Sequence, residues 1–200
     1  RNVDLVRNSG YHQHGMSQPQ RRYSLPDYFA IEMMSPVRHE FYCGEIFAMA
    51  GASVEHNMIT VNLLTTLQVA LRRKRCNVFG SDLRIATPGG LYTYPDVSVI
   101  CGKVVLVTGA PDTATNPVVL IEVLSDATRD YDRGEKFELY KTIPTLREYV
   151  LIDQQRIVVD HFTRRRDSWI EGSAASLSSK VSLRSLKVDL SVREVYRGVA

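Results

Sequence analysis

The pattern of apolar and polar positions is clearest in the middle of the chain. Residues 118–124 form a run of Val, Leu and Ile that is interrupted by a single acid, Glu122. Such runs are typical of a strand covered on both faces of a sheet. The segment 94–101 instead alternates between two faces, and Asp96 stands near its start. We therefore expect two buried strands, each carrying one carboxylate.

A helix is expected after the second carboxylate. Lys136 and Tyr140 fall on one mostly apolar helical face, and Pro144 ends the pattern. Asp132 followed by Glu135 has the spacing of a capping box, with Asp in place of the usual Ser or Thr. The pattern predicts a helix that begins near Asp132 and directs Lys136 toward the sheet rather than toward water.

Strand and helix signals alternate along the rest of the chain. The expected elements are a short helix capped near Ser24, a hairpin over 41–49 turning at Cys43 and Gly44, a helix capped by Ser53, a strand over 78–86 broken at 80–82, a short strand over 104–107, a hairpin over 149–153 and 157–162, and a closing helix over 190–196. We interpret 173–180 as a linker.

Length and composition are those of an ordinary globular protein. The chain has 200 residues, of which 44% are hydrophobic and 24% charged, so we expect one domain over 21–200 with a sizeable core. Residues 1–20 are polar and lack periodicity, which favours a disordered leader or an expression remnant. The formal net charge of +3 is small, so binding of a polyanion would depend on local patches.

Cysteine usage and hydropathy bear on the cellular compartment. Cys43, Cys76 and Cys101 include no pair with CxxC spacing, which argues against a disulfide framework or a structural zinc site. No apolar run is long enough to span a membrane, and no secretory signal is visible. We therefore expect reduced thiols in a cytoplasmic protein that does not bind membranes.

The two strand carboxylates and the helix lysine are the candidate chemistry. An ionised carboxylate inside a buried strand costs several kcal/mol unless a cation or hydrogen-bond donors compensate it, so some group should meet Glu122. If the strands are neighbours, Asp96 and Glu122 can hold one hard divalent cation, most plausibly magnesium. The alternative is structural: Glu122 and Lys136 form a buried ion pair and Asp96 caps a turn. The residues alone leave both interpretations open.

Several segments carry a resemblance to a known family. The sequences YPDVSV (94–99), IEVLS (121–125), YDRGEKFELY (131–140) and LREYVLID (146–153) are similar to a large bacterial family of restriction-endonuclease-like proteins, once classed as a domain of unknown function. The similarity covers roughly 25–196. Pro95 and Asp96 followed by Glu122 also resemble the PD-(D/E)XK nuclease superfamily.

The resemblance implies a fold, an activity and a site. The fold would be α/β (α+β), a restriction-endonuclease-like mixed β-sheet flanked by helices, with an N-terminal β-hairpin. The activity would be magnesium-dependent hydrolysis of DNA, with manganese as a substitute and a homodimer suited to cutting both strands. Asp96, Glu122 and Lys136 correspond to the family's aspartate, glutamate and lysine. In the superfamily the lysine lies two residues after the acid, where this chain has Leu124.

Other polar residues are candidates with plainer alternatives. Glu45 is either a surface acid or, given the resemblance, a further metal ligand. His56 is a supporting partner of a carboxylate, a proton carrier or a polar residue at a helix start. Asp82 is either a third acid or a loop acid. The cations Arg72, Arg73, Lys74 and Arg75, like those at 164–166, either end an element in solvent or bind nucleic-acid phosphates.

Three functions follow from these observations. The favoured one is a metal-dependent DNA endonuclease. The second is a nuclease-like protein that binds DNA or assembles on it without cleavage. The third is a glycoside hydrolase that uses the two acids, which lacks support because Trp169 is the only tryptophan available as a sugar platform.

Overall fold

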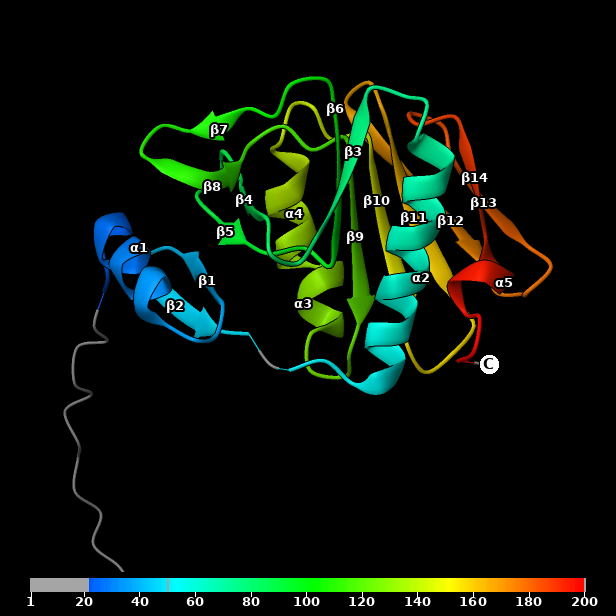
Figure 1. Cartoon of the computed structure of the whole chain (residues 1–200), viewed down its shortest axis with the longest axis horizontal. Helices are drawn as coiled ribbons and strands as arrows, with labels where there is room; N and C mark the ends of the chain where they lie inside the picture. Colours follow the sequence, from blue (N-terminus) through cyan, green and yellow to red (C-terminus); the bar gives the residue numbers. More distant parts are fainter. Residues whose placement is uncertain (1–21, 50, 200) are drawn as a thin grey trace, which may run out of the picture.

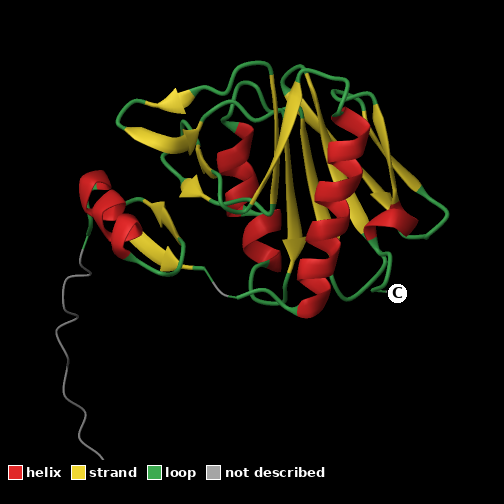
Figure 2. Ribbon diagram, in the orientation of Figure 1, coloured by secondary structure: helices red, strands yellow, loops and turns green. Residues whose placement is uncertain are grey.

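The computed structural model describes residues 22–49 and 51–199, so the predicted leader over 1–20 lies outside the described residues. Two six-stranded sheets and a two-stranded hairpin form the described part, together with five helices (Figures 1 and 2). This is the predicted class, a mixed α+β fold in which helices flank the sheets.

The central sheet contains both predicted carboxylate strands as neighbours. Its order is β12 (Ser168–Ala174), β11 (Val159–Arg165), β10 (Glu148–Asp153), β9 (Val119–Leu124), β6 (Val97–Cys101) and β3 (Cys76–Gly80). Strand β9 runs parallel to β10 and antiparallel to β6. Because Val97 pairs with Ile121, Asp96 lies beside Glu122 at one end of the sheet.

The second sheet carries the N-terminal part of the chain. Its order is β2 (Glu45–Ala48), β1 (His39–Tyr42), β5 (Tyr92–Thr93), β4 (Arg84–Ala86), β8 (Ala110–Ala114) and β7 (Leu106–Val107). The β1–β2 turn falls at Cys43 and Gly44, as predicted, and both have positive φ, 49° and 83°. Helix α1 (Leu25–Met34) precedes it, begins with a Ser24–Asp27 capping box, and forms with β1 and β2 what we call the N-terminal unit, residues 22–49.

Helices cover both faces of the central sheet (Figure 1). Helix α2 (Val54–Leu71) is capped by Ser53, as predicted, and buries Ile59, Leu63 and Leu67 against one face. Helices α3 (Arg129–Arg133) and α4 (Glu135–Lys141) lie on the other face, where Phe137 and Tyr140 join its core. The site residues therefore come from strands held between two apolar layers.

The C-terminal segment differs from the prediction. Strands β13 (Lys180–Leu183) and β14 (Val188–Ser191) form a hairpin, and helix α5 is only Val192–Val195. The linker expected over 173–180 begins inside β12. The four-residue strands of this hairpin were missed because serines and lysines dilute their alternation, whereas in the structure Val181, Leu183 and Leu190 pack into the α2-side core.

The expectation of unpaired thiols was wrong for two of the three cysteines. Cys76 and Cys101, 25 residues apart, form a disulfide between directly opposed positions of β3 and β6. Their pairing depends on the register of two strands, which spacing along the chain does not reveal. Cys43 is free and exposed.

Reduction of this disulfide should lower stability. Closing a 25-residue loop removes chain entropy from the unfolded state, which corresponds to about 3 kcal/mol. Urea unfolding with and without dithiothreitol should differ by that amount in the parent and not at all in Cys101→Ser. Cys43→Ser is the matched control and should retain the effect of the reductant. Coincident unfolding curves of the parent with and without reductant would show that the bond does not form.

Candidate active site

A single buried ammonium lies at the centre of the candidate site. The Lys136 Nζ is 3.0 Å from Glu122 Oε1, 3.1 Å from Glu40 Oε1 and 3.2 Å from Asp132 Oδ1. These carboxylates come from β9, from α3, which follows it in sequence, and from the distant strand β1. The prediction that Lys136 faces the sheet is confirmed, and Lys136 is the cation that meets Glu122.

Asp96 is held at the edge of this cluster. Its Oδ2 accepts a hydrogen bond from the Val123 backbone N–H at 2.7 Å, and its own N–H donates to Glu122 Oε2 at 3.2 Å. The His56 Nε2 lies 3.2 Å from Asp96 Oδ2, on the first turn of α2. Of the three interpretations of His56, this contact agrees with the one in which it is the partner of a carboxylate.

The environment of His56 favours its cationic form. Burial lowers the pKa of His56. The Asp96 carboxylate and a hydrogen bond with the Val123 backbone raise it by more than burial lowers it, so the net pKa of His56 lies above its ordinary value. The Ser53 hydroxyl accepts the His56 backbone N–H at 3.1 Å and so fixes the start of the helix. The imidazole is thereby held against Asp96 by the helix cap rather than by a flexible loop.

Burial acts in opposite directions on the pKa values of Glu122 and Lys136. Burial raises the pKa of Glu122 to about 8, and Asp132 and Asp96 add to this while Lys136 opposes it. Burial lowers the pKa of Lys136, but the surrounding carboxylates, Glu122 first, outweigh that effect and raise it well above its usual value. Tyr140 donates its hydroxyl to Glu122 Oε1 at 2.7 Å. Lys136 is therefore a permanent cation.

Asp132 belongs to the candidate site, although its spacing in the sequence suggested a helix cap. The predicted capping box is wrong: Asp132 lies inside α3, and the helix breaks at Gly134 before α4 begins. Across that break Asp132 and Lys136 keep their i, i+4 contact, and the Asp132 side chain is only 4% exposed. Its Oδ1 is buried and forms no hydrogen bond, although it lies in ion-pair range of Lys136.

Glu40 occupies the place that was considered for Glu45. Glu40 contacts Lys136 and accepts a hydrogen bond from the Thr93 hydroxyl. Glu45 stands at the turn end of the same hairpin, opposite Tyr42, and within the described residues no ion pair or hydrogen bond joins it to the site. The available signal was position: Glu40 lies inside a strand, whereas Glu45 directly follows a turn.

A buried polar network holds the N-terminal unit, and with it Glu40, against the rest of the fold. Glu32 Oε1 accepts hydrogen bonds from the Tyr94 hydroxyl at 2.9 Å and from the His39 backbone at 3.1 Å. Arg84 donates to Tyr94 at 3.1 Å and to Thr113 at 2.7 Å. Because His39 is the neighbour of Glu40, this network fixes the strand that presents Glu40 to Lys136.

The candidates Asp82, Arg164 and Trp169 make contacts outside the cluster around Lys136. Asp82 is 92% exposed and pairs with Arg38, so it is a loop acid. Arg164 donates to the backbone carbonyls of Ile143, Leu146 and Lys141 and so fixes the end of α4. Trp169 is partly buried and packs edge-on against Phe137, with 5.3 Å between the ring centroids, so its ring lies at the edge of the core and is not offered as a sugar platform.

The donor chemistry and the charge of the cluster fit a divalent cation. Asp96, Glu122, Glu40 and Asp132 present hard oxygen donors, which magnesium prefers, and when all four are ionised Lys136 and His56 are too few cations to balance them. The buried Asp132 Oδ1 also forms no hydrogen bond. Within 22–49 and 51–199 no group of three or more acid, His or Cys side chains already surrounds one point as ligands. The fit therefore rests on chemistry and charge.

The two hairpin glutamates provide a matched pair of variants. Glu40→Gln should remove one of the carboxylates around Lys136 and weaken the affinity for manganese by about 10- to 100-fold, since the amide neither balances the ammonium nor contributes negative charge near the cation. Glu45→Gln should leave that affinity within about twofold. Calorimetric titration of the two variants with manganese chloride tests this. A larger loss in Glu45→Gln than in Glu40→Gln would reverse the assignment.

Comparisons with known proteins agree with this architecture. The Uma2 family, described as "Putative restriction endonuclease", matches residues 25–193. Two proteins of Synechocystis sp. (strain ATCC 27184 / PCC 6803 / Kazusa) are each 33% identical to this chain. The match with slr1290 covers 94% of this chain and 98% of slr1290, and the match with sll1609 covers 81% of this chain and 93% of sll1609.

A solved structure shares the fold. The crystal structure described as a putative nuclease belonging to DUF820, from Anabaena variabilis ATCC 29413, superposes with a TM-score of 0.69 at 16% identity. The match covers 83% of this chain and 93% of that one. The family match over residues 25–193 shows that the chain belongs to the Uma2 family of restriction-endonuclease-like proteins, and the solved structure agrees in fold.

Proposed function

We propose that this chain is a metal-dependent endonuclease that hydrolyses DNA phosphodiester bonds at Asp96, Glu122 and Lys136. The observation that carries the proposal is the excess of buried carboxylates around one lysine. A structural ion pair needs one carboxylate for one ammonium, and further buried acids would only add desolvation cost. A site that takes up a divalent cation explains the excess.

Each residue has a role that its surroundings support. Asp96 and Glu122 would hold magnesium, or manganese in its place, which supplies Lewis-acid stabilisation of the phosphate and a water of lowered pKa. Lys136 stays protonated and stabilises negative charge on the phosphoryl oxygens instead of acting as a base. Tyr140 and His56 orient Glu122 and Asp96 through the contacts described above.

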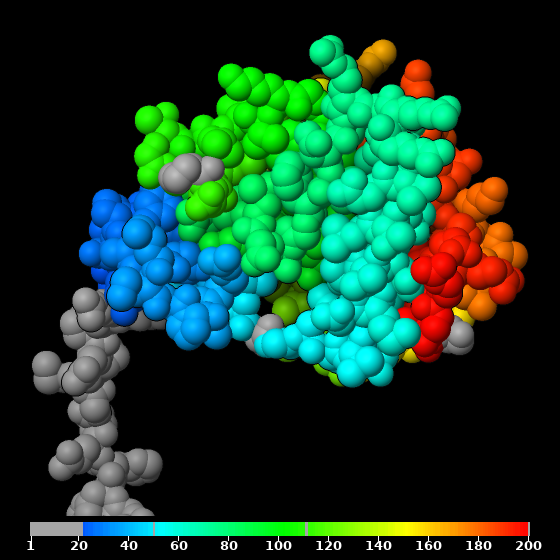
Figure 3. All heavy atoms as spheres, viewed as in Figure 1, coloured from blue at the N-terminus to red at the C-terminus, as the bar shows by residue number. Residues whose placement is uncertain are grey.

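A hollow in the surface lies beside the helix that carries His56. In the space-filling view the surface is hollowed between the N-terminal unit and the first turns of α2 (Figure 3). Asp96 and His56 side chains are 15% and 14% exposed, more than Glu122 or Lys136. Of these four residues, Asp96 and His56 are therefore the ones that a ligand from solvent can reach most readily.

The test is cleavage of supercoiled plasmid, linear duplex, single-stranded DNA and RNA with magnesium, with manganese and with excess chelator. The proposal expects nicked or linear plasmid only when a divalent metal is present. A folded protein that binds DNA but cuts none of these substrates under any metal condition would instead be a nuclease-like binding protein.

Location and assembly are part of the same proposal. No described helix has the length and hydropathy needed to cross a membrane. We propose a cytoplasmic protein that acts on DNA, and a homodimer would place two sites on two strands.

A further inference from the structure

A basic pocket lies at the far end of β6 from Asp96. Its volume is about 460 Å³, and it is lined by Lys74, Arg75, Cys76, Asn77, Gly102 and Lys103. Three of these residues are cations and none carries a carboxylate. Such a lining attracts an anion, because nothing within it offsets the positive charge.

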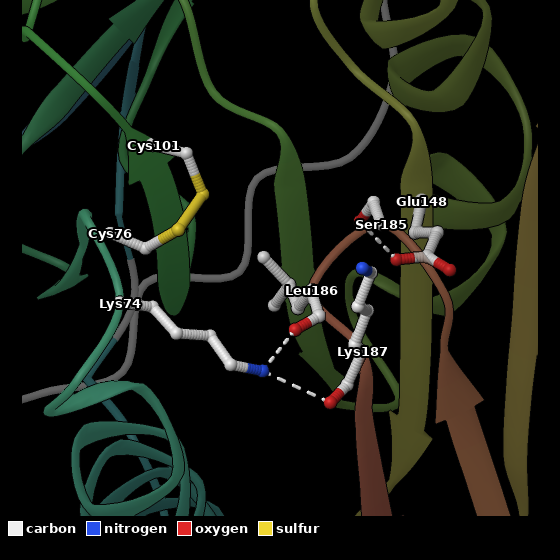
Figure 4. Close-up of a disulfide and its surroundings, with 7 residues drawn as sticks. All are labelled: Lys74, Cys76, Cys101, Glu148, Ser185, Leu186 and Lys187. Atoms are coloured by element: carbon white, nitrogen blue, oxygen red, sulfur yellow. Dashed lines mark hydrogen bonds between the residues drawn. A yellow bond between two sulfur atoms is a disulfide. The ribbon is translucent and has the colours of Figure 1, made fainter.

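Within the described residues, no carboxylate neutralises the positive charges of this pocket. Throughout 22–49 and 51–199, neither the Arg75 guanidinium nor the Lys103 ammonium has a carboxylate within ion-pair distance. Many other arginines of the chain are paired, for example Arg129 with Asp153 and Arg38 with Asp82. Lys74 donates to two carbonyls, Leu186 O at 2.5 Å and Lys187 O at 3.0 Å, so its charge also remains unneutralised (Figure 4).

The backbone under the pocket is fixed on both strands. The Cys76–Cys101 disulfide joins β3 to β6 directly beside Arg75 and Gly102 (Figure 4). The Gly102 N–H also donates a hydrogen bond to Arg75 O at 2.6 Å. The Asn116 side-chain amide donates one to the Lys103 carbonyl at 3.0 Å. Arg75 and Lys103 are therefore presented from a rigid platform, which lowers the entropic cost of binding a ligand between them.

We propose that Arg75 and Lys103 bind backbone phosphates of nucleic acid outside the cleavage site, an inference that rests on the proposed function for its choice of partner. Arg75 offers a planar guanidinium suited to two phosphate oxygens, and Lys103 adds a second cation across the pocket. A five-residue strand separates this pocket from Asp96, roughly 17 Å at 3.4 Å per residue. That span equals about five base pairs of duplex.

The position favours a long ligand over a small one. The pocket is an open surface hollow, whereas small-molecule sites are usually enclosed and largely apolar. A continuous strand of phosphates could reach both the pocket and Asp96, so contacts here would strengthen binding without entering the chemistry. The expectation is sequence-independent affinity that depends on salt.

Fluorescence anisotropy of a labelled 20-base-pair duplex, in chelator so that no cleavage occurs, tests the inference. Parent and Arg75→Gln/Lys103→Gln are compared between 50 and 250 mM KCl, with Lys180→Gln/Arg193→Gln as a control that removes equal charge from two exposed positions elsewhere. The double variant should bind about tenfold more weakly at low salt, and its slope of log affinity against log salt should fall by roughly 1.8. The control should lose far less.

Three results would overturn the inference: no measurable duplex binding by the parent, equal losses in the two double variants, or adenosine monophosphate binding as tightly as the duplex. The last would identify a site for small phosphates. Cleavage is scored separately, so the two proposals can fail independently. Duplex binding that depends on Arg75 and Lys103 without any cleavage would remove the proposed function and leave this inference standing.

Discussion

Asp96→Asn should reduce metal-dependent cleavage by about a thousandfold, which corresponds to about 4 kcal/mol of transition-state stabilisation. The amide keeps the size of the side chain and an oxygen that can accept the Val123 N–H, so the fold should survive. It removes the charge through which this residue would hold a divalent cation. Initial rates of plasmid nicking at saturating magnesium measure the loss.

The control for this variant is Asp82→Asn. Asp82 is an acid of the same kind that is 92% exposed and paired only with Arg38. We expect its cleavage rate to stay within about twofold of the parent, because exposed ion pairs contribute little. Retention of more than a tenth of parental activity in Asp96→Asn would remove Asp96 from the chemistry.

Lys136→Met should lose both stability and activity. Removing one partner of a buried ionic cluster leaves the other charges uncompensated, a cost of about 3 to 5 kcal/mol. Glu40, Glu122 and Asp132 would then lie together with no ammonium between them. Urea unfolding at pH 7.5 measures the loss of stability, and plasmid nicking should fall at least a hundredfold.

The deficit in Lys136→Met should grow as the pH is raised from 7 to 9. Burial raises the folded pKa of Glu122 to about 8, so below that pH the carboxyl is largely protonated in both proteins, whereas above it the parent balances the ionised carboxylate with Lys136 and the variant cannot. Lys141→Met is the matched control, since Lys141 pairs with the exposed Glu138 and lies over the Phe137 ring, and its stability should change by about 1 kcal/mol or less. A Lys136→Met protein as stable and active as the parent would make the ammonium dispensable.

Local pattern was sufficient to predict the core of the site. The apolar run around Glu122 and the helical face of Lys136 each depend on neighbours within a few residues, and both are as predicted. Their contact then follows from strand β9 leading directly into the helices that cover it. The same local signals predicted helix α2 with its Ser53 cap and the turn at Cys43 and Gly44.

Two of the missed features depend on contacts between distant segments, and the third, Asp132, depends on a local break in a helix. Glu40 belongs to the site only because β1 pairs with β5 and brings the N-terminal unit over Lys136. Asp132 matched a helix cap in its local spacing, but the break at Gly134 places it inside a preceding helix. The Cys76–Cys101 bond likewise depends on strand register. None of these arrangements leaves a periodic signal in the sequence.

The most direct measurement of the central claim is a time course of supercoiled plasmid incubated with the parent protein, with chelator added partway and magnesium restored afterwards. The account predicts that nicking stops on chelation and resumes when magnesium is in excess, while Asp96→Asn stays inactive throughout. Nicking that continues in chelator, or a well-folded parent that cuts no DNA with any divalent metal, would contradict it.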